Sequence, residues 1–252
     1  MLGKLIGHPS WDWAAFGKHP VAKDYFQLNL ESPMASAFAS WVDAGFRRLS
    51  EDERRDTACS WRFWAKGLKK GTTVCGLGKS SSDSIGRPYP MMIIGEGALD
   101  QWEKFWHLML VGLGPTWETL EYASTRRLRS LDQLEMDINH FETPRKQWQQ
   151  ARQLNHRELA GDLPGWKNNK IILSGVREKV RALETDGRLL IPLDGQEPMD
   201  PFQLAVAWHL ALKDCQSPLP NTVFMGGTPD KTFLALYSRP LSPDDFTVLW
   251  SV

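Results

Sequence analysis

The chain has 252 residues, with 30 Lys and Arg against 30 Asp and Glu, and 42% of its residues are hydrophobic. This composition excludes a wholly disordered chain, and the balanced charge gives no general attraction to nucleic acid or to an anionic membrane. The three cysteines form no C-x-x-C pair, which disfavours a zinc ribbon and favours a reducing compartment. No apolar run approaches the ~20 residues of a membrane span, and residues 1–7 lack the apolar core of a secretory signal. We therefore expect a cytoplasmic protein without direct membrane insertion.

The first third of the chain predicts strands around one helix. Residues 11–16 are typical of a strand in which Trp11 and Trp13 share a face. Apolar residues at three- and four-residue steps predict a helix from Pro33 to about Leu49, and the polar run that follows breaks this pattern. Further strands are expected at 61–66, 72–77 and 89–95, the first two forming a pair around residues 69–71.

A helical insert is expected from Leu99 to about Gly161. Gly112, Gly114 and Pro115 interrupt its first apolar face, so a second helix is expected from Thr116 to about Asp137 and a third after Pro144. This insert separates the early strands from a second group of strands.

Strands and helices alternate irregularly after the insert. Strands are expected at 170–174, 187–193, 221–226 and 232–238, and helices begin at Pro201 and near Pro243. Strands on both sides of a helical insert predict an α/β fold, an α+β-like sandwich with a mixed sheet and helices packed on it, as a single domain over residues 1–252. The expected core includes Trp61, Phe63 or Trp64, Val74, Ile93 and Ile94.

Motifs for cofactor or metal chemistry are incomplete. The run Gly76–Ser80 resembles a phosphate-binding loop, but Thr73 stands where the first glycine is required and no helix is expected to follow, so we interpret it as a turn between strands. The six histidines have no zinc-binding spacing, and His107 and His209 are expected to be packed in helices. Cys75 is expected to be a buried, inert thiol. We expect no metal and no cofactor.

Basic residues cluster in two places. Arg126, Arg127 and Arg129 are expected on the second helix of the insert, and Lys167 and Lys170 flank a pair of asparagines. In a chain with no net charge, such clusters are more often solvated faces than nucleic-acid sites.

One constellation of charged residues lies in two turn-rich, apolar segments. Lys18 and Asp24 belong to the first, and Asp83 and Arg87 to the second. We expect the two segments to lie side by side, with Arg87 bonded to a carboxylate or a carbonyl oxygen. A structural ion-pair network is favoured over catalysis, because such networks resemble active sites.

The ordered motifs G-K-x-P, D-[FY], F-x-x-W-x-x-x-G, W-R-F and S-x-D-x-x-G-R-x-[FY]-P resemble the TagF/ImpM family of type VI secretion system-associated proteins. The matching residues are Gly17, Lys18, Pro20, Asp24, Tyr25, Phe26, Phe38, Trp41, Gly45, Trp61, Arg62, Phe63, Ser81, Asp83, Gly86, Arg87, Tyr89 and Pro90. The chain departs from the family at Ser80, where proline is usual, and at Ala22-Lys23, where arginine-glycine is usual.

The resemblance implies an α/β sandwich distantly like longin domains. It also implies a cytoplasmic accessory protein that regulates type VI secretion after translation, usually as a repressor, by binding a forkhead-associated scaffold protein. Catalysis is not implied, and the motif residues become candidates for the loop clamp or for binding. They are Lys18, Asp24, Trp61, Arg62, Ser81, Asp83, Gly86, Arg87 and Pro90.

Two alternatives remain open. One is a small enzyme that acts on a phosphorylated ligand through Lys18, Asp24, Asp83 and Arg87, and the other is a purely structural subunit of the secretion assembly. The binding hypothesis predicts that some of the twelve tryptophans are exposed as interface anchors.

Overall fold

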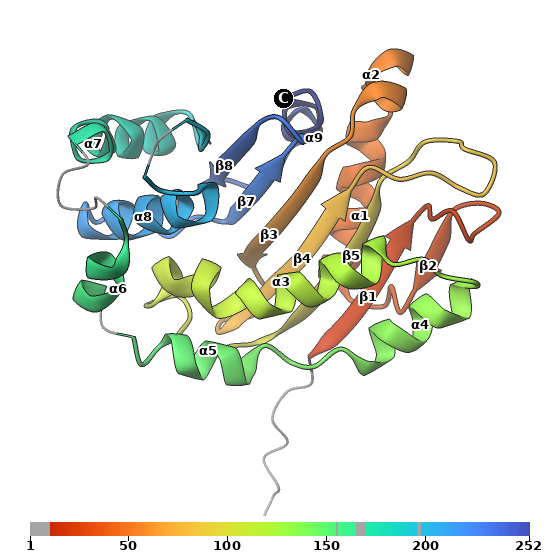
Figure 1. The fold of residues 1–252 in the computed structure, drawn as a ribbon, viewed down its shortest axis with the longest axis horizontal. Coiled ribbons are helices and arrows are strands. Elements are labelled where there is room, and N and C mark those ends of the chain that lie inside the picture. Colours follow the sequence, from red (N-terminus) through yellow and green to blue (C-terminus); the bar gives the residue numbers. More distant parts are fainter. Residues whose placement is uncertain (1–10, 155, 165–169, 196–197) are drawn as a thin grey trace, which may run out of the picture.

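An eight-stranded sheet runs through the computed structural model, which describes residues 11–154, 156–164, 170–195 and 198–252 (Figure 1). The strands are β1 (Asp12–Gly17), β2 (Phe26–Leu28), β3 (Ser60–Lys66), β4 (Thr72–Lys79), β5 (Met91–Ala98), β6 (Arg188–Pro192), β7 (Thr222–Gly227) and β8 (Thr232–Tyr237). Their order is β2-β1-β5-β4-β3-β7-β8-β6. All pairings among these strands are antiparallel, so the predicted mixed sheet is wrong in this respect.

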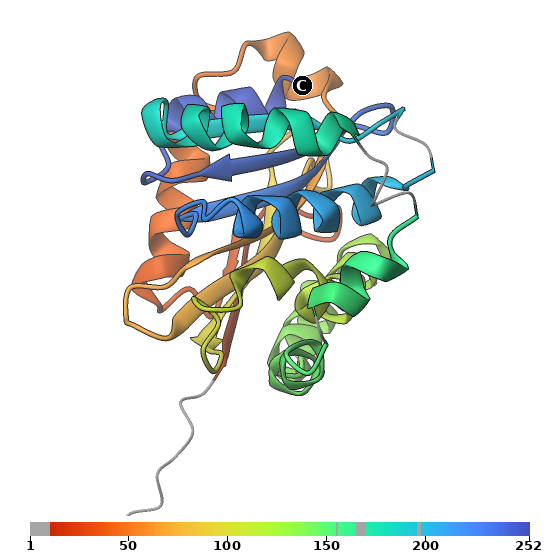
Figure 2. The same ribbon diagram turned by 90° about the vertical axis from the view of Figure 1, so that its left-hand side faces the viewer.

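Helices cover both faces of the sheet. One face carries α1 (Pro33–Phe46) and α9 (Pro243–Trp250), with α2 (Glu51–Asp56) following α1. The opposite face carries the 3-10 turn η1 (Trp106–Leu108), α3 (Met109–Thr125), α4 (Leu131–His140), α5 (Arg145–Ala151), α6 (His156–Asp162), α7 (Lys170–Thr185) and α8 (Pro201–Asp214). Figure 2 shows α1 and the α3–α5 group on opposite sides of the sheet. This arrangement is the predicted sandwich.

Because both faces are covered, side chains on both sides of each central strand are buried. Trp61 and Phe63 of β3 pack toward α1 and α9, whereas Trp64 packs toward η1 and α8. The sequence left open which of these aromatic residues points inward, and the structure buries all of them. Val74, Ile93 and Ile94, also predicted in the core, are buried as well.

One predicted element differs in type, and one short helix lies where the sequence predicted only a break. Residues 170–174 begin helix α7 and are not a strand, because the apolar run Ile171–Leu173 continues into a helical repeat that buries Val176 and Leu183. The polar run after α1 contains helix α2, which begins with a capping box between Ser50 and Glu53.

The helical insert also has a different break point. Helix α3 runs through Pro115 to Thr125, and the chain turns at 126–130 instead of at the predicted glycines. The face of α3 that includes Leu113, Trp117 and Leu120 is completely buried, and this burial outweighs the backbone hydrogen bond lost at proline. The helix predicted after Pro144 is confirmed as α5.

Some expectations fall outside the described residues, namely those for residues 1–7, for Lys167 and for the asparagines beside it. Across the described ranges, no helix is both long and apolar enough to span a membrane.

Candidate functional site: the loop clamp

Two loops leave the sheet at the same end, and both carry the sequence motifs. The first follows β1 and the second joins β4 to β5, and Gly17 of β1 pairs with Met91 of β5. Gly17 has a φ of 118°, and a Cβ there would lie 2.0 Å from the carbonyl oxygen of Pro90. The loops therefore begin in a backbone contact that only glycine permits.

The Asp83 carboxylate joins the two loops from the inside, and its side chain is completely buried. Lys18 Nζ lies 3.0 Å from Oδ2, and Arg87 Nε donates to the same oxygen at 2.6 Å. The backbone N–H groups of Ile85 and Arg87 donate to Oδ1 at 3.1 and 3.0 Å. We call Lys18, Asp24, Asp83 and Arg87 the loop clamp.

Arg87 extends the clamp to the surface. Its Nη2 donates to the carbonyl oxygen of Lys23 at 3.1 Å and lies 3.2 Å from Asp24 Oδ2. The Ser84 N–H also donates to the Ala22 carbonyl oxygen at 2.9 Å. The two segments thus lie side by side, with Arg87 bonded to carboxylates, but the Arg87 side chain is 48% exposed and its pair with Asp24 is solvated.

The pKa shifts in the clamp indicate a structural ion-pair network. Desolvation acts to raise the pKa of the Asp83 carboxyl, but the hydrogen bonds from Lys18 and Arg87 outweigh it and hold the pKa well below its ordinary value. The pKa of Asp24 is also lowered, first by the Tyr25 backbone N–H and then by Arg87. Both carboxylates are therefore ionised at neutral pH. Since four donors already occupy the Asp83 oxygens, this group is poorly placed to take a proton from a substrate.

The outer side of the clamp presents apolar groups next to charges. Ile85 is 73% exposed, and Tyr25 is 37% exposed. The Tyr25 ring packs edge-on against Tyr89, with the centroids 5.4 Å apart. We call Tyr25, Ile85 and Tyr89, with the neighbouring Asp24 and Arg87, the clamp surface.

Comparison with protein families assigns the chain to a family. A family model for the TagF N-terminal domain, described as type VI secretion system-associated, matches residues 14–141, which include the whole loop clamp. The chain belongs to the TagF family. The protein is therefore type VI secretion system-associated.

Comparison with solved structures finds PA0076 from Pseudomonas aeruginosa PAO1, at 22% identity over 53% of this chain and with a TM-score of 0.42. The match spans 64% of that protein, which is less than two thirds of its length. Comparison with curated proteins finds no match.

The W-R-F motif of this TagF-family chain lies away from the clamp, in β3. Trp61 Nε1 donates to the carbonyl oxygen of Leu249 in α9 at 3.1 Å. Arg62 donates to both carboxylate oxygens of Glu121 in α3, at 2.7 and 2.8 Å. These two candidate site residues thus attach helices to opposite faces of the sheet, and the structure does not bring them together with Asp83.

Ser81 and Gly86 lie beside the clamp and line a cavity of about 960 Å³. Its cationic residues are Arg54, Arg55, Lys79, Arg126 and Arg127, and we call it the basic cavity. Only the last two belong to a basic cluster that the sequence predicted, and that cluster was expected on a helix, whereas both residues follow the end of α3. No contiguous motif joins the other three, because they come from α2 and the end of β4.

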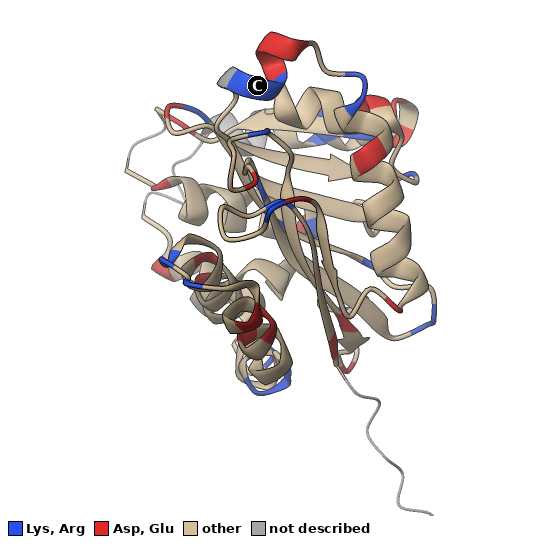
Figure 3. Cartoon of the chain, turned by 90° about the vertical axis from the view of Figure 1, so that its right-hand side faces the viewer, with Lys and Arg blue, Asp and Glu red and all other residues tan. Residues whose placement is uncertain are grey.

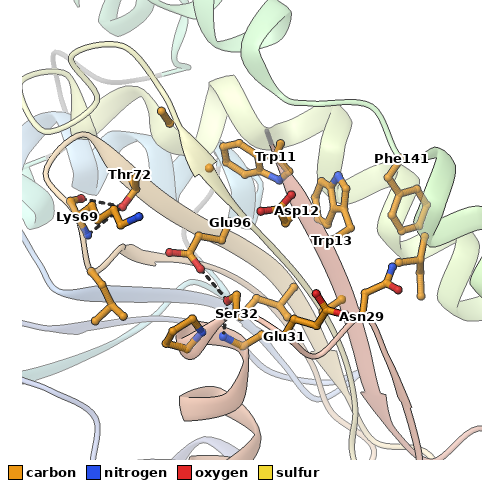
Figure 4. Close-up of a pocket in the computed structure, with 18 of the residues that line it drawn as sticks. Trp11, Asp12, Trp13, Asn29, Glu31, Ser32, Lys69, Thr72, Glu96 and Phe141 are labelled. Atoms are coloured by element: carbon orange, nitrogen blue, oxygen red, sulfur yellow. Dashed lines mark hydrogen bonds between the residues drawn. The ribbon is translucent and has the colours of Figure 1, made fainter. Parts of the chain in front are cut away.

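A second cavity, of about 800 Å³, has the opposite character (Figure 4). Asp12, Glu31 and Glu96 line it together with Trp11 and Trp13. Glu96 accepts a hydrogen bond from the Ser32 hydroxyl at 2.7 Å, and that hydroxyl also caps α1. This acidic cavity therefore helps to place α1, and no motif in the sequence indicated it.

The other residues considered for cofactor, metal or thiol chemistry are packed inside the fold. The run from Gly76 to Lys79 lies inside β4, so the predicted turn is wrong and no phosphate-binding loop forms. Burial raises the pKa of the Cys75 thiol, and it lowers the pKa of His209 to about 4. His107 is buried too. Within the described ranges, no group of three or more His, Cys, Asp or Glu is placed to hold a metal ion.

Proposed function

We propose that this TagF-family protein is a cytoplasmic regulator that represses type VI secretion after translation by binding a forkhead-associated scaffold protein through the clamp surface. The observation that carries the proposal is the loop clamp, which lies within the family match and holds exposed apolar groups on a rigid support. A preorganised loop loses little conformational entropy on binding.

The clamp surface has the chemistry of a protein interface. Exposed Ile85 and Tyr25 supply apolar contact, while Asp24 and Arg87 supply a charged rim. The predicted tryptophan anchors are absent from the described surface, because every described tryptophan is buried. Trp166 lies outside the described residues. A partner that buries a standard ~1,600 Å² would therefore extend beyond the clamp to neighbouring polar surface.

We also propose that residues 1–252 act as one domain. The family match ends at residue 141, but β3 pairs with β7, and β6 and β8 continue the same sheet. A fragment that ended near residue 141 would expose the edge of β3 and would not be a suitable test protein.

The direct test is binding of the purified scaffold protein to the full chain, measured by calorimetry. We expect Ile85→Ser to weaken binding at least about tenfold, because an interface anchor is lost. Leu68→Ser is the matched control, since Leu68 is 67% exposed in the β3–β4 turn, at the opposite end of β4 from the clamp loop. Equal losses in the two variants, or none in either, would overturn the clamp as the binding surface.

Overexpression in the source cell tests repression. Secretion is expected to fall while the amounts of other secretion components stay constant, and Ile85→Ser should relieve the block. Unchanged secretion after both deletion and overexpression would contradict a regulatory role.

We propose that the protein acts without catalysis. The enzyme alternative makes a different prediction, namely turnover of a phosphorylated ligand that is lost in Asp83→Asn. Turnover together with failure to bind any type VI component would replace the binding proposal with the enzyme.

A further inference from the structure

The basic cavity concentrates positive charge on a molecule with no net charge. It lies between α2, the end of β4, the clamp loop and the turn after α3. Among the described residues that line it, five are Lys or Arg and none is Asp or Glu. The acidic and basic turns of α2 are separated along the helix (Figure 3), and only the basic turn lines the cavity. Such one-signed walls attract counter-ions.

Much of this charge is not neutralised within the described part of the chain. Lys79 is half-buried, and its ammonium contacts only the carbonyl oxygen of Ser124, at 3.4 Å. Glu121 attracts Lys79 from a greater distance but is bonded by both arms of Arg62. Desolvation lowers the pKa of Lys79, as expected for an ammonium with no adjacent carboxylate.

Among the four arginines of the cavity, Arg126 is paired with Asp137, whereas the other three have no carboxylate partner among the described residues. Arg55 and Arg127 are exposed, and within the described residues no carboxylate pairs with them. Arg54 is held in place by the carbonyl oxygens of Phe46 and Arg47, to which its Nε and Nη2 donate at 3.1 and 2.7 Å. This arrangement leaves the charge of Arg54 uncompensated.

The other lining residues indicate the class of anion. Hydroxyl groups come from Thr57, Ser80, Ser81, Ser82, Ser124 and Thr125. Guanidinium, ammonium and hydroxyl groups donate hydrogen bonds to phosphate oxygens in many phosphate-binding sites. No Phe, Tyr or Trp is found among the described lining residues, so the imidazole of His19 is the one aromatic ring there on which a nucleobase could stack.

We infer that the basic cavity binds an anion carrying two or more phosphate groups, through Lys79, Arg55 and Arg127 with the neighbouring hydroxyls. A volume of about 960 Å³ exceeds the need of one phosphate, and the cations come from separate elements around it. The same groups could arrive as inorganic polyphosphate or on a nucleotide. This site adjoins the clamp surface at Gly86, but none of the five clamp-surface residues lines it, so the inference does not depend on the proposed scaffold binding.

Calorimetry on the full chain tests the inference with phosphate, pyrophosphate, tripolyphosphate and ATP, each without magnesium. Affinity should rise at least about tenfold from phosphate to tripolyphosphate and fall with added salt, because the contacts are ionic. ATP should bind within about threefold of tripolyphosphate if only phosphates are recognised. A much tighter ATP complex would assign the ligand to a nucleotide and overturn recognition by phosphate alone. Absence of binding to all four at millimolar concentration would overturn the site.

Two double variants distinguish binding in the cavity from general attraction by the net charge of the protein. Arg55→Glu with Arg127→Glu should weaken tripolyphosphate binding at least about tenfold. Arg177→Glu with Arg181→Glu makes the same charge change on the exposed side of α7, outside the lining residues, and should change binding less than about twofold. Equal weakening in both would show diffuse attraction and refute the cavity. Unfolding by urea establishes that each variant is folded.

Discussion

Two buried carboxylates in this protein are bonded in different ways. Asp83 accepts from Lys18 of another loop and from Arg87 and Ile85 of its own. Asp245 at the start of α9 is equally buried, but its hydrogen-bond donors are near in sequence, and Arg188 of β6 adds only a longer ion pair at 3.8 Å. Both arms of Arg239 donate to it at 2.6 and 2.8 Å, and the backbone N–H and hydroxyl of Ser242 donate at 2.7 and 2.8 Å.

The difference shows how each carboxylate contributes to the fold. Asp245 stabilises the end of a helix whose Phe246, Leu249 and Trp250 belong to the core, so its loss should spread to the whole molecule. Asp83 joins two loops beyond the ends of β1 and β5, so its loss should open the loops and leave the sheet paired. Four experiments test this difference between the two carboxylates.

The largest effect is expected where the clamp meets the sheet, at Gly17. Gly17→Ala should lower the free energy of unfolding by at least about 3 kcal/mol, because the new Cβ meets the Pro90 oxygen and the backbone is strained. Gly86→Ala is the control, since it also has positive φ but no atom within 4 Å, and it should cost about 1 kcal/mol. Urea unfolding measures both, and equal losses would contradict the Pro90 contact.

Asp245→Ala should lower the free energy of unfolding by about 3 kcal/mol, because the partly buried Arg239 and Ser242 lose a buried acceptor that is bonded four times. Asp244→Ala is the matched control on the next residue. The Asp244 side chain is 73% exposed in its pair with Arg48, so its loss should cost no more than about 1 kcal/mol. If both variants unfold alike, the buried network is not the source of stability.

Asp83→Ala should act locally. Amide hydrogen exchange at Ile85 and Arg87 should become about tenfold faster, because both N–H groups lose their acceptor, while exchange in β4 and β5 should change little. Asp24→Ala, at the exposed end of the clamp, should accelerate these amides less. Faster exchange throughout the sheet would mean that the clamp is part of the global folding unit.

The smallest effect is expected from pH. Desolvation acts to raise the pKa of Asp245, but Arg239 and Ser242 hold it below its ordinary value of 3.8. The contribution of the ionised group is thus fully present above the unfolded pKa and is lost as pH falls through the folded pKa. The stability difference between the natural chain and Asp245→Asn should be constant from neutral pH to about pH 5 and shrink below about pH 4. If the stability difference grew at acidic pH, the pKa of Asp245 would be raised in the folded protein and not lowered.

Local sequence patterns predicted the helices and strands correctly where one pattern was much stronger than its alternatives. Two strand-like runs around a turn at residues 69–71 predicted β3 and β4, and proline predicted the starts of α1, α8 and α9. They failed where tertiary burial decided the outcome. Helix α3 continues through Pro115 because its buried face holds it together, and a short apolar run became the start of α7. A short apolar run alone does not distinguish a strand from a buried helix.

The residues of the loop clamp could be identified from the sequence alone, because complementary charges and a glycine stand in two short motifs. Which of these charges is buried depends on the fold, since the burial of Asp83 requires the pairing of β1 with β5. The basic cavity was decided entirely by tertiary structure. Its cations lie on α2, on β4 and after α3, and their side chains become neighbours only when the sheet and helices pack. A sequence motif shows only charges that are close along the chain, whereas the electrostatic potential at a point sums all the charges that are close in space.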